Sequence, residues 1–170
     1  MTPAVLVAAW LGSGAAVAEE RWQALTIPAT GFTVEMPGEP TRQQDMTEGG
    51  LRYVLYTAED DPVRDYVAGV QEIAADAVAK GAEQIYDRAR DSLVRSTAGK
   101  VRAERKVKCD GVDGREIIID ATDDTGVNTL IDRIFLKGNR LYQLGAIVPR
   151  GTEHDAVVMR FLDSARIRGD

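Results

Sequence analysis

The chain alternates between apolar and polar residues in several short segments, which is the period of half-buried β-strands. In the first segment Phe32, Val34 and Met36 alternate with polar residues, and the run ends at the Pro-Gly turn 37–40. Glycine, proline and aspartate turn signals separate the later runs. The pattern predicts further strands at Thr41–Met46, Leu51–Ala58, Asp65–Ile73, Lys100–Cys109, Gly114–Ala121, Thr129–Leu136 and Arg140–Val148.

Two segments change to apolar steps of three and four, the pattern of an amphipathic helix. We expect the first helix from about Gly81 to Ala98, with Gly99 as its C-terminal stop. The second closes the chain, with Thr152 as N-cap and Asp155 three residues on, close to a capping box. The apolar stripes consist of Ala82, Ile85, Tyr86, Ala89 and Leu93 in the first helix, and of Val157, Val158, Phe161, Leu162 and Ala165 in the second.

The order of these elements predicts an α+β fold, an α-β-α sandwich with a central antiparallel sheet. Turn signals at Lys137–Asn139 and Asp123–Gly126 join the late strands as antiparallel neighbours. Those strands are apolar on both faces, so we expect a helix to cover each side of the sheet. The chain has 170 residues, of which 44% are hydrophobic, and we expect residues 19–170 to form a single domain.

Residues 1–18 form a separate apolar segment that ends in the small-residue pattern Ala16-Val17-Ala18, followed by two glutamates. This is typical of a secretory signal, and it predicts cleavage after Ala18 and a periplasmic or secreted protein. No lysine or arginine precedes the apolar run, so either the true start of the chain lies upstream or the signal is atypical. An uncleaved tether is the alternative, although the run is shorter than the ~20 residues of a membrane span.

Charge and composition narrow the kinds of partner and site. With 21 basic and 27 acidic residues the formal net charge is −6, which disfavours binding to nucleic-acid phosphates. The one cysteine, Cys109, excludes an intramolecular disulfide and a cysteine-rich metal site, and the one histidine, His154, excludes a site with two imidazoles. We expect no cofactor and no metal.

Three stretches together resemble a known family. They are "W…GFTVEMPGEPTRQ" from Trp22 to Gln43, "GVDGREIII" from Gly111 to Ile119, and "NRLYQLGAIVP…VVMRFLDSARI" from Asn139 to Ile167. They are similar to small exported bacterial proteins with the PsbP/Mog1-like fold, the group that includes DcrB-like periplasmic proteins. Ala165 stands where phenylalanine is usual in that family. The resemblance implies an antiparallel α-β-α sandwich and an accessory or binding protein, because its motifs are turns and core stripes without catalytic groups.

A local basic run lies within this acidic chain, and alternation places most of its side chains on one face of the strand Lys100–Cys109. One interpretation is a surface that docks an acidic protein partner in the cell envelope, or lipid headgroups. The other is an edge strand that lysines protect against edge-to-edge pairing. The candidate partner-binding residues are Lys100, Arg102, Arg105, Lys106 and Lys108.

The remaining candidates for chemistry favour structural interpretations. His154 lies at a helix start between Glu153 and Asp155 without a nucleophile motif, so we expect an exposed side chain. Cys109 shares a strand face with Val101 and Val107, which predicts a buried, unreactive thiol.

Acidic and aromatic residues give no stronger signal. The acidic stretch Asp120–Gly126 lacks the spacing of a calcium-binding EF-hand, and a hairpin turn explains it. At strand spacing the aromatic residues favour core or rim positions over ligand contacts; they are Tyr53, Tyr56, Tyr66 and Tyr142.

The sequence therefore favours a non-enzymatic exported binding protein that docks a protein partner or the envelope surface. The first alternative is a carrier that holds a small ligand in a pocket between the sheet and one helix. An apolar pocket with a few convergent polar groups would favour the carrier. The second alternative is an unfamiliar hydrolase, which would need a cluster of perturbed titratable groups in a cleft.

Overall fold

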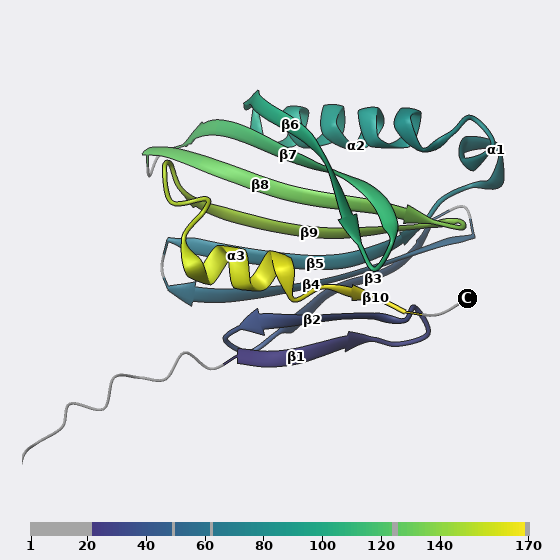
Figure 1. Cartoon of the computed structure of the whole chain (residues 1–170), viewed down its shortest axis with the longest axis horizontal. Helices are drawn as coiled ribbons and strands as arrows, with labels where there is room; N and C mark the ends of the chain where they lie inside the picture. Colours follow the sequence, from purple (N-terminus) through teal and green to yellow (C-terminus); the bar gives the residue numbers. More distant parts are fainter. Residues whose placement is uncertain (1–21, 49, 62, 124–125, 169–170) are drawn as a thin grey trace, which may run out of the picture.

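The computed structural model describes residues 22–48, 50–61, 63–123 and 126–168, and the expected signal segment 1–18 lies outside them. Seven strands form one antiparallel sheet in the order β3-β4-β5-β9-β8-β7-β6 (Figure 1). The strands are β3 (Thr41–Glu48), β4 (Leu51–Asp61), β5 (Arg64–Glu72), β6 (Lys100–Cys109), β7 (Val112–Asp123), β8 (Gly126–Lys137) and β9 (Arg140–Pro149). The hairpin expected at Lys137–Asn139 is confirmed, because Lys137 pairs with Arg140 across a two-residue loop.

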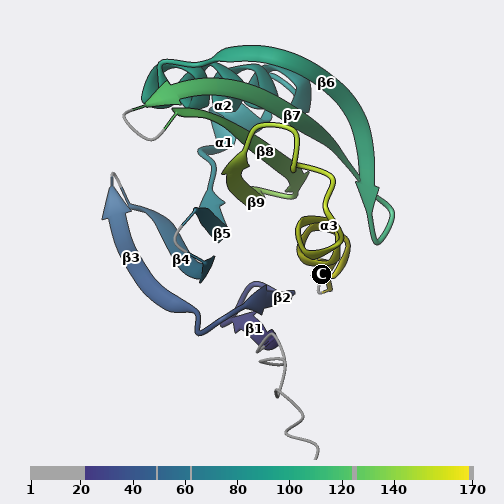
Figure 2. The same ribbon diagram turned by 90° about the vertical axis from the view of Figure 1, so that its left-hand side faces the viewer.

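Helices lie on both faces of this sheet, which confirms the predicted α+β sandwich. One face carries the long helix α2 (Ala82–Thr97), preceded by the single turn α1 (Ala75–Val78). The opposite face carries α3 (Ala156–Asp163) together with a small sheet in the order β1-β2-β10, which the sequence pattern did not predict as a separate sheet. Figure 2 shows α2 and α3 on opposite sides of the sheet. The small sheet consists of β1 (Trp22–Ile27), β2 (Phe32–Pro37) and β10 (Arg166–Ile167).

Each face has its own apolar core, because consecutive residues of a strand point to opposite sides. Ile117 and Ile119 of β7 pack under α2, whereas Ile118 packs on the α3 side. The α3 side is the larger core, where Tyr66 meets Phe161 edge to face with ring centroids 5.2 Å apart. The core under α2 consists of Ile85, Tyr86, Ile117, Ile119, Leu130, Ile134 and Leu141.

The C-terminus of α2 and the N-terminus of α3 differ from the prediction. Helix α2 ends at Thr97, one residue before the expected Ala98. Ala98, with φ of 48°, takes the left-handed conformation that was expected of Gly99. Gly99 is required for a different reason, since a Cβ there would lie 2.8 Å from the carbonyl oxygen of Asp120. Thr152 is not the N-cap of α3, because its hydroxyl donates to the Pro149 carbonyl and the helix begins only at Ala156.

Strand β6 lies at one end of the sheet, and a bulge interrupts its alternation between Val101 and Ala103. Beyond the bulge Arg105 pairs with Glu116 on the α3 face, whereas Lys106 pairs with Arg115 on the α2 face. Lys100 and Arg105 therefore share the α3 face, whereas Lys106 and Lys108 share the α2 face, so strict alternation, which groups Lys100 with Lys106 and Lys108, assigns these faces wrongly. A β-bulge adds one residue to a strand and reverses the facing of the residues beyond it, which a strict period of two cannot anticipate.

No helix in the described ranges is both long enough and apolar enough to span a membrane.

Candidate functional site

A groove with a volume of about 390 Å³ lies between α2 and the sheet, and we call it the α2 groove. The C-terminal half of α2 forms one wall, and strands β4, β5, β9 and β8 form the floor and the other wall. The helix contributes Ala89, Ser92, Leu93, Ser96 and Thr97. The strands contribute apolar side chains from Leu55, Val67, Leu130, Ile134, Leu141 and Ile147, and polar ones from Tyr53, Gln71, Asp132 and Gln143.

One glycine, Gly145, lines the α2 groove, and a second, Gly69, lies on the neighbouring strand β5. Gly69 of β5 pairs with Gln143, and Gly145 of β9 pairs with both Val67 and Asp132. A Cβ at Gly145 would lie 2.8 Å from Oδ1 of Asp132, so only glycine leaves room for that carboxyl group. A Cβ at Gly69 would lie 2.9 Å from the Val54 carbonyl oxygen. Both positions therefore require glycine, and Gly145 leaves space in the groove beside Asp132.

Asp132 is the central polar group of the α2 groove, and its residue surface is 0% exposed. The Gln143 side-chain amide donates a hydrogen bond of 2.9 Å to Oδ1. The second oxygen, Oδ2, has no hydrogen-bond partner within the described part of the chain. Burial raises the pKa of Asp132 to about 7, against the lowering effect of the Gln143 hydrogen bond. The carboxyl group therefore changes charge near neutral pH.

The electrostatic character of the α2 groove follows from Asp132. Tyr53 is the other titratable residue that lines it, and burial followed by the charge of Asp132 raises the pKa of the Tyr53 phenol. No lysine or arginine is among the described residues that line the groove. The groove thus presents one formal charge, a negative one, within a largely apolar surface.

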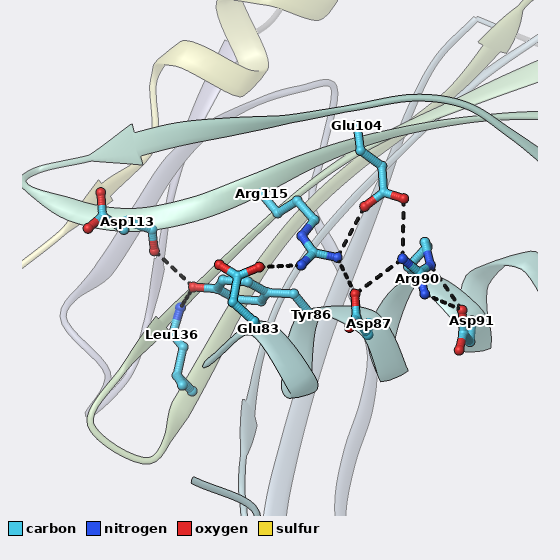
Figure 3. Close-up of polar contacts among 9 residues, drawn as sticks. All are labelled: Glu83, Tyr86, Asp87, Arg90, Asp91, Glu104, Asp113, Arg115 and Leu136. Atoms are coloured by element: carbon cyan, nitrogen blue, oxygen red, sulfur yellow. Dashed lines mark hydrogen bonds and ion pairs between the residues drawn. The ribbon is translucent and has the colours of Figure 1, made fainter. Parts of the chain in front are cut away.

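Helix α2 is fixed to the sheet at the end away from this groove (Figure 3). The Arg115 guanidinium binds Glu83 at 2.6 Å and Asp87 at 2.7 Å, and it also reaches Glu104 of β6. The Tyr86 hydroxyl donates to the Asp113 carbonyl and accepts a hydrogen bond from the Leu136 amide. These contacts hold the N-terminal half of the helix, and hence set the position of the groove wall.

A second recess continues the α2 groove toward α1. It shares Gln71, Ala89, Ser92 and Leu141 with the groove and has a volume of about 340 Å³. Arg88 and Glu72 lie on its lining, so charged groups of both signs stand at this far end.

The predicted partner-binding residues are all exposed on β6. This strand forms the edge of the sheet opposite to β3, so it is remote from β4 and β5. Arg102 binds Glu153 and Asp120, Arg105 binds Glu116, and Lys108 binds Asp113. Lys100 and Lys106 form no ion pair with any described residue. Three of the five charges, those of Arg102, Arg105 and Lys108, are thus already paired within the protein, and partner docking by this strand stays a prediction.

The other candidates lie where the sequence predicts, with one exception. Cys109 is buried and its thiol donates to the Ala165 carbonyl, while burial raises its pKa. His154 is exposed, and Tyr66 and Tyr142 are core residues. Tyr53 is the exception, because it lines the α2 groove.

The sequence interpretation missed Asp132, Gln143 and Gly145 entirely. A signal was present, because two charged residues, Asp132 and Arg133, interrupt the apolar run Leu130–Phe135. Buried charges within an apolar strand need a partner or a function.

No protein-family model matches the sequence, and no curated protein matches it. Among solved structures, cyanobacterial PsbP (CyanoP) from Synechocystis sp. PCC 6803 matches with a TM-score of 0.63 and 13% identity, over 93% of this chain and 99% of that one. PA94, a protein of unknown function from Pseudomonas aeruginosa, matches with a TM-score of 0.52 and 8% identity, over 88% and 99%.

The Ran-binding protein Mog1p from Saccharomyces cerevisiae matches with a TM-score of 0.46 and 8% identity, over 87% and 96%. At 13% and 8% identity, the likeness to CyanoP and PA94 concerns the fold and not the activity. The chain has the PsbP/Mog1-like fold that its sequence motifs resemble.

Proposed function

We propose that this protein is an exported, non-enzymatic binding domain that holds a small, largely apolar ligand in the α2 groove. The observation that carries the proposal is the hollow of about 390 Å³ between α2 and the sheet, in which Gly145 leaves space beside Asp132. Its volume falls within the range of small-molecule sites, and it combines apolar walls with a few polar groups. The β6 cations carry less weight, because three of the five are neutralised within the protein.

The contents of the groove support binding over catalysis. Ser92, Ser96 and Thr97 supply hydroxyl groups, but the one histidine lies in a different recess beside Glu116 and Ile118. A serine or threonine nucleophile needs a base within hydrogen-bond reach, and His154 cannot serve as one there. Asp132 lines the same groove, but among the described residues its carboxyl group accepts a hydrogen bond from Gln143 and from no hydroxyl group.

The binding test uses N-phenyl-1-naphthylamine, an uncharged fluorescent probe of apolar sites. We expect its emission to rise on addition of the protein, and Ser92→Trp, which fills the groove from the helix wall, to reduce this rise severalfold. Gln84→Trp is the matched control, because Gln84 is exposed on α2 away from the groove and should leave the rise unchanged. An equal rise in both variants, or none in the unaltered protein, would rule out the groove as the binding site.

Export rests on the segment 1–18 alone. We expect the protein expressed in its own cells to be recovered outside the cytoplasm with Glu19 as its first residue, because a secretory signal is cut after the A-x-A pattern. Fractionation followed by N-terminal sequencing checks this. Recovery in the cytoplasm with residues 1–18 intact would contradict it.

A further inference from the structure

We propose that the α2 groove selects organic cations, namely small amines with an apolar body whose ammonium group pairs with the carboxylate of Asp132. This inference rests on the proposed function, because it names the ligand class of the same groove. It goes further because it assigns recognition of the ligand's positive charge to one residue, Asp132.

The first argument is the incomplete hydrogen bonding of Asp132. Buried side-chain oxygens in proteins almost always have partners, and a buried carboxylate without them is costly. Gln143 satisfies Oδ1, whereas Oδ2 has no partner in the part of the chain that the structure describes. An ammonium group carries three N–H donors and no acceptor, which is the complement of a carboxylate oxygen.

The second argument is the sign of the charge. Asp132 lines the groove with Tyr53 from β4, Gln71 from β5 and Gln143 from β9. Helix α2 adds the hydroxyl groups of Ser92, Ser96 and Thr97, so no described cation of the protein lines the groove with Asp132. An anionic ligand would place a like charge beside Asp132 in an apolar setting. The net charge of −6 also favours the approach of cations over anions.

The third argument concerns the body of the ligand. The walls of the α2 groove are aliphatic, and Tyr53 adds an aromatic ring to the same lining. Aromatic rings attract cations as well as apolar groups. Because Asp132 has no exposed surface, the ammonium group reaches Oδ2 only when a neighbouring side chain gives way. The half-buried Gln143 can move only by breaking its 2.9 Å hydrogen bond to Oδ1, which a second N–H of the ammonium group would replace. An amine with a flat apolar body of one or two rings fits these requirements.

Binding of a cation is expected to depend on pH. The cation pairs with ionised Asp132, whose pKa of about 7 in the free protein must fall when the complex forms. Protonation below pH 7 therefore competes with the ligand, while the amine itself keeps its charge up to a pKa of roughly 10. The affinity should increase from pH 5.5 to pH 8.

The experiment compares 2-naphthylethylamine with 2-naphthylethanol, which has the same shape without the charge. Displacement of N-phenyl-1-naphthylamine and titration calorimetry measure both at pH 8 and pH 5.5, in the unaltered protein and in Asp132→Asn. We expect the amine to bind about 10- to 100-fold more tightly than the alcohol at pH 8, the size of a charge-assisted hydrogen bond. This advantage should shrink at least about tenfold at pH 5.5 and vanish in Asp132→Asn at both pH values.

The outcomes separate the two proposals. If the alcohol and the amine bind equally, or if the advantage of the amine survives in Asp132→Asn, cation selection is wrong while the groove remains a binding site. If neither compound nor the uncharged probe binds, the proposed function itself fails. The pH comparison uses the unaltered protein, so the cation proposal can be refuted even if the variant does not fold.

Discussion

Asp132→Asn is expected to abolish a fall in stability of about 2.5 kcal/mol that the unaltered protein shows between pH 5 and pH 8. The aspartate carboxyl has an ordinary pKa of 3.8, which burial raises to about 7 in the folded chain. Between these values the folded state holds a proton that the unfolded state has released. Stability is therefore highest below the unfolded pKa and falls as the pH rises through the folded one. Asparagine keeps the shape of the side chain and cannot titrate.

Urea unfolding at pH 5, 6.5 and 8 measures this effect. Asp65→Asn is the control, since Asp65 is exposed on β5 and its removal should leave the pH dependence intact. If Asp132→Asn loses stability with rising pH as steeply as the unaltered protein, Asp132 is not the titrating group. Asp132→Asn would then no longer be a valid test of cation binding in the ligand experiment.

Glu116→Ala is expected to destabilise the protein by about 3 to 5 kcal/mol at neutral pH. Glu116 is 1% exposed and binds Arg105 at 2.5 Å and Arg133 at 2.7 Å. Burial opposes its ionisation, but the two guanidinium groups outweigh burial and hold the pKa of Glu116 below its ordinary value. Removal of the carboxylate leaves the buried cation of Arg133 with only the exposed carboxylate of Asp163. An uncompensated buried charge is the source of the cost.

The free energy of unfolding in denaturant checks this prediction. Asp113→Ala on the same strand is the control, because its ion pair with Lys108 is exposed and exposed pairs contribute little to stability. A loss below about 1 kcal/mol for Glu116→Ala would mean that the buried pair contributes little net energy, as some buried ion pairs do. The lowered pKa also predicts that the contribution of Glu116 is lost as the pH falls from 4.5, its ordinary pKa, through the lower pKa of the folded state.

Periodicity predicted the main elements because their burial is regular. The stripe Ile85, Tyr86, Ala89 and Leu93 faces the sheet as a period of 3.6 requires. The three isoleucines from Ile117 to Ile119 indicated a strand covered on both faces, and each face does have its own core.

Features set by tertiary contact escaped prediction. The bulge in β6 and the left-handed Ala98 depend on how neighbouring strands fit, which a one-dimensional pattern does not contain. The sequence suggested a pocket between the sheet and one helix as one alternative, but it did not identify the residues of the α2 groove. Its residues come from four strands and a helix, and Asp132 and Gly145 meet only through the pairing of β8 with β9.

The strand order has a consequence for folding kinetics and local opening. The strands β3 to β5 form one antiparallel meander and β6 to β9 another, each from neighbours in sequence. One long-range seam joins them, in which residues 65–72 of β5 pair with residues 140–147 of β9. Such distant pairing costs loop entropy and forms late in folding.

The groove lining spans this seam, with Val67 and Gln71 on β5 and Gly145 on β9. A sub-global fluctuation that parts β5 from β9 would leave both meanders intact and erase the binding site. Ligand occupancy should therefore slow amide hydrogen exchange along the seam more than within either meander, because the ligand bridges the two halves.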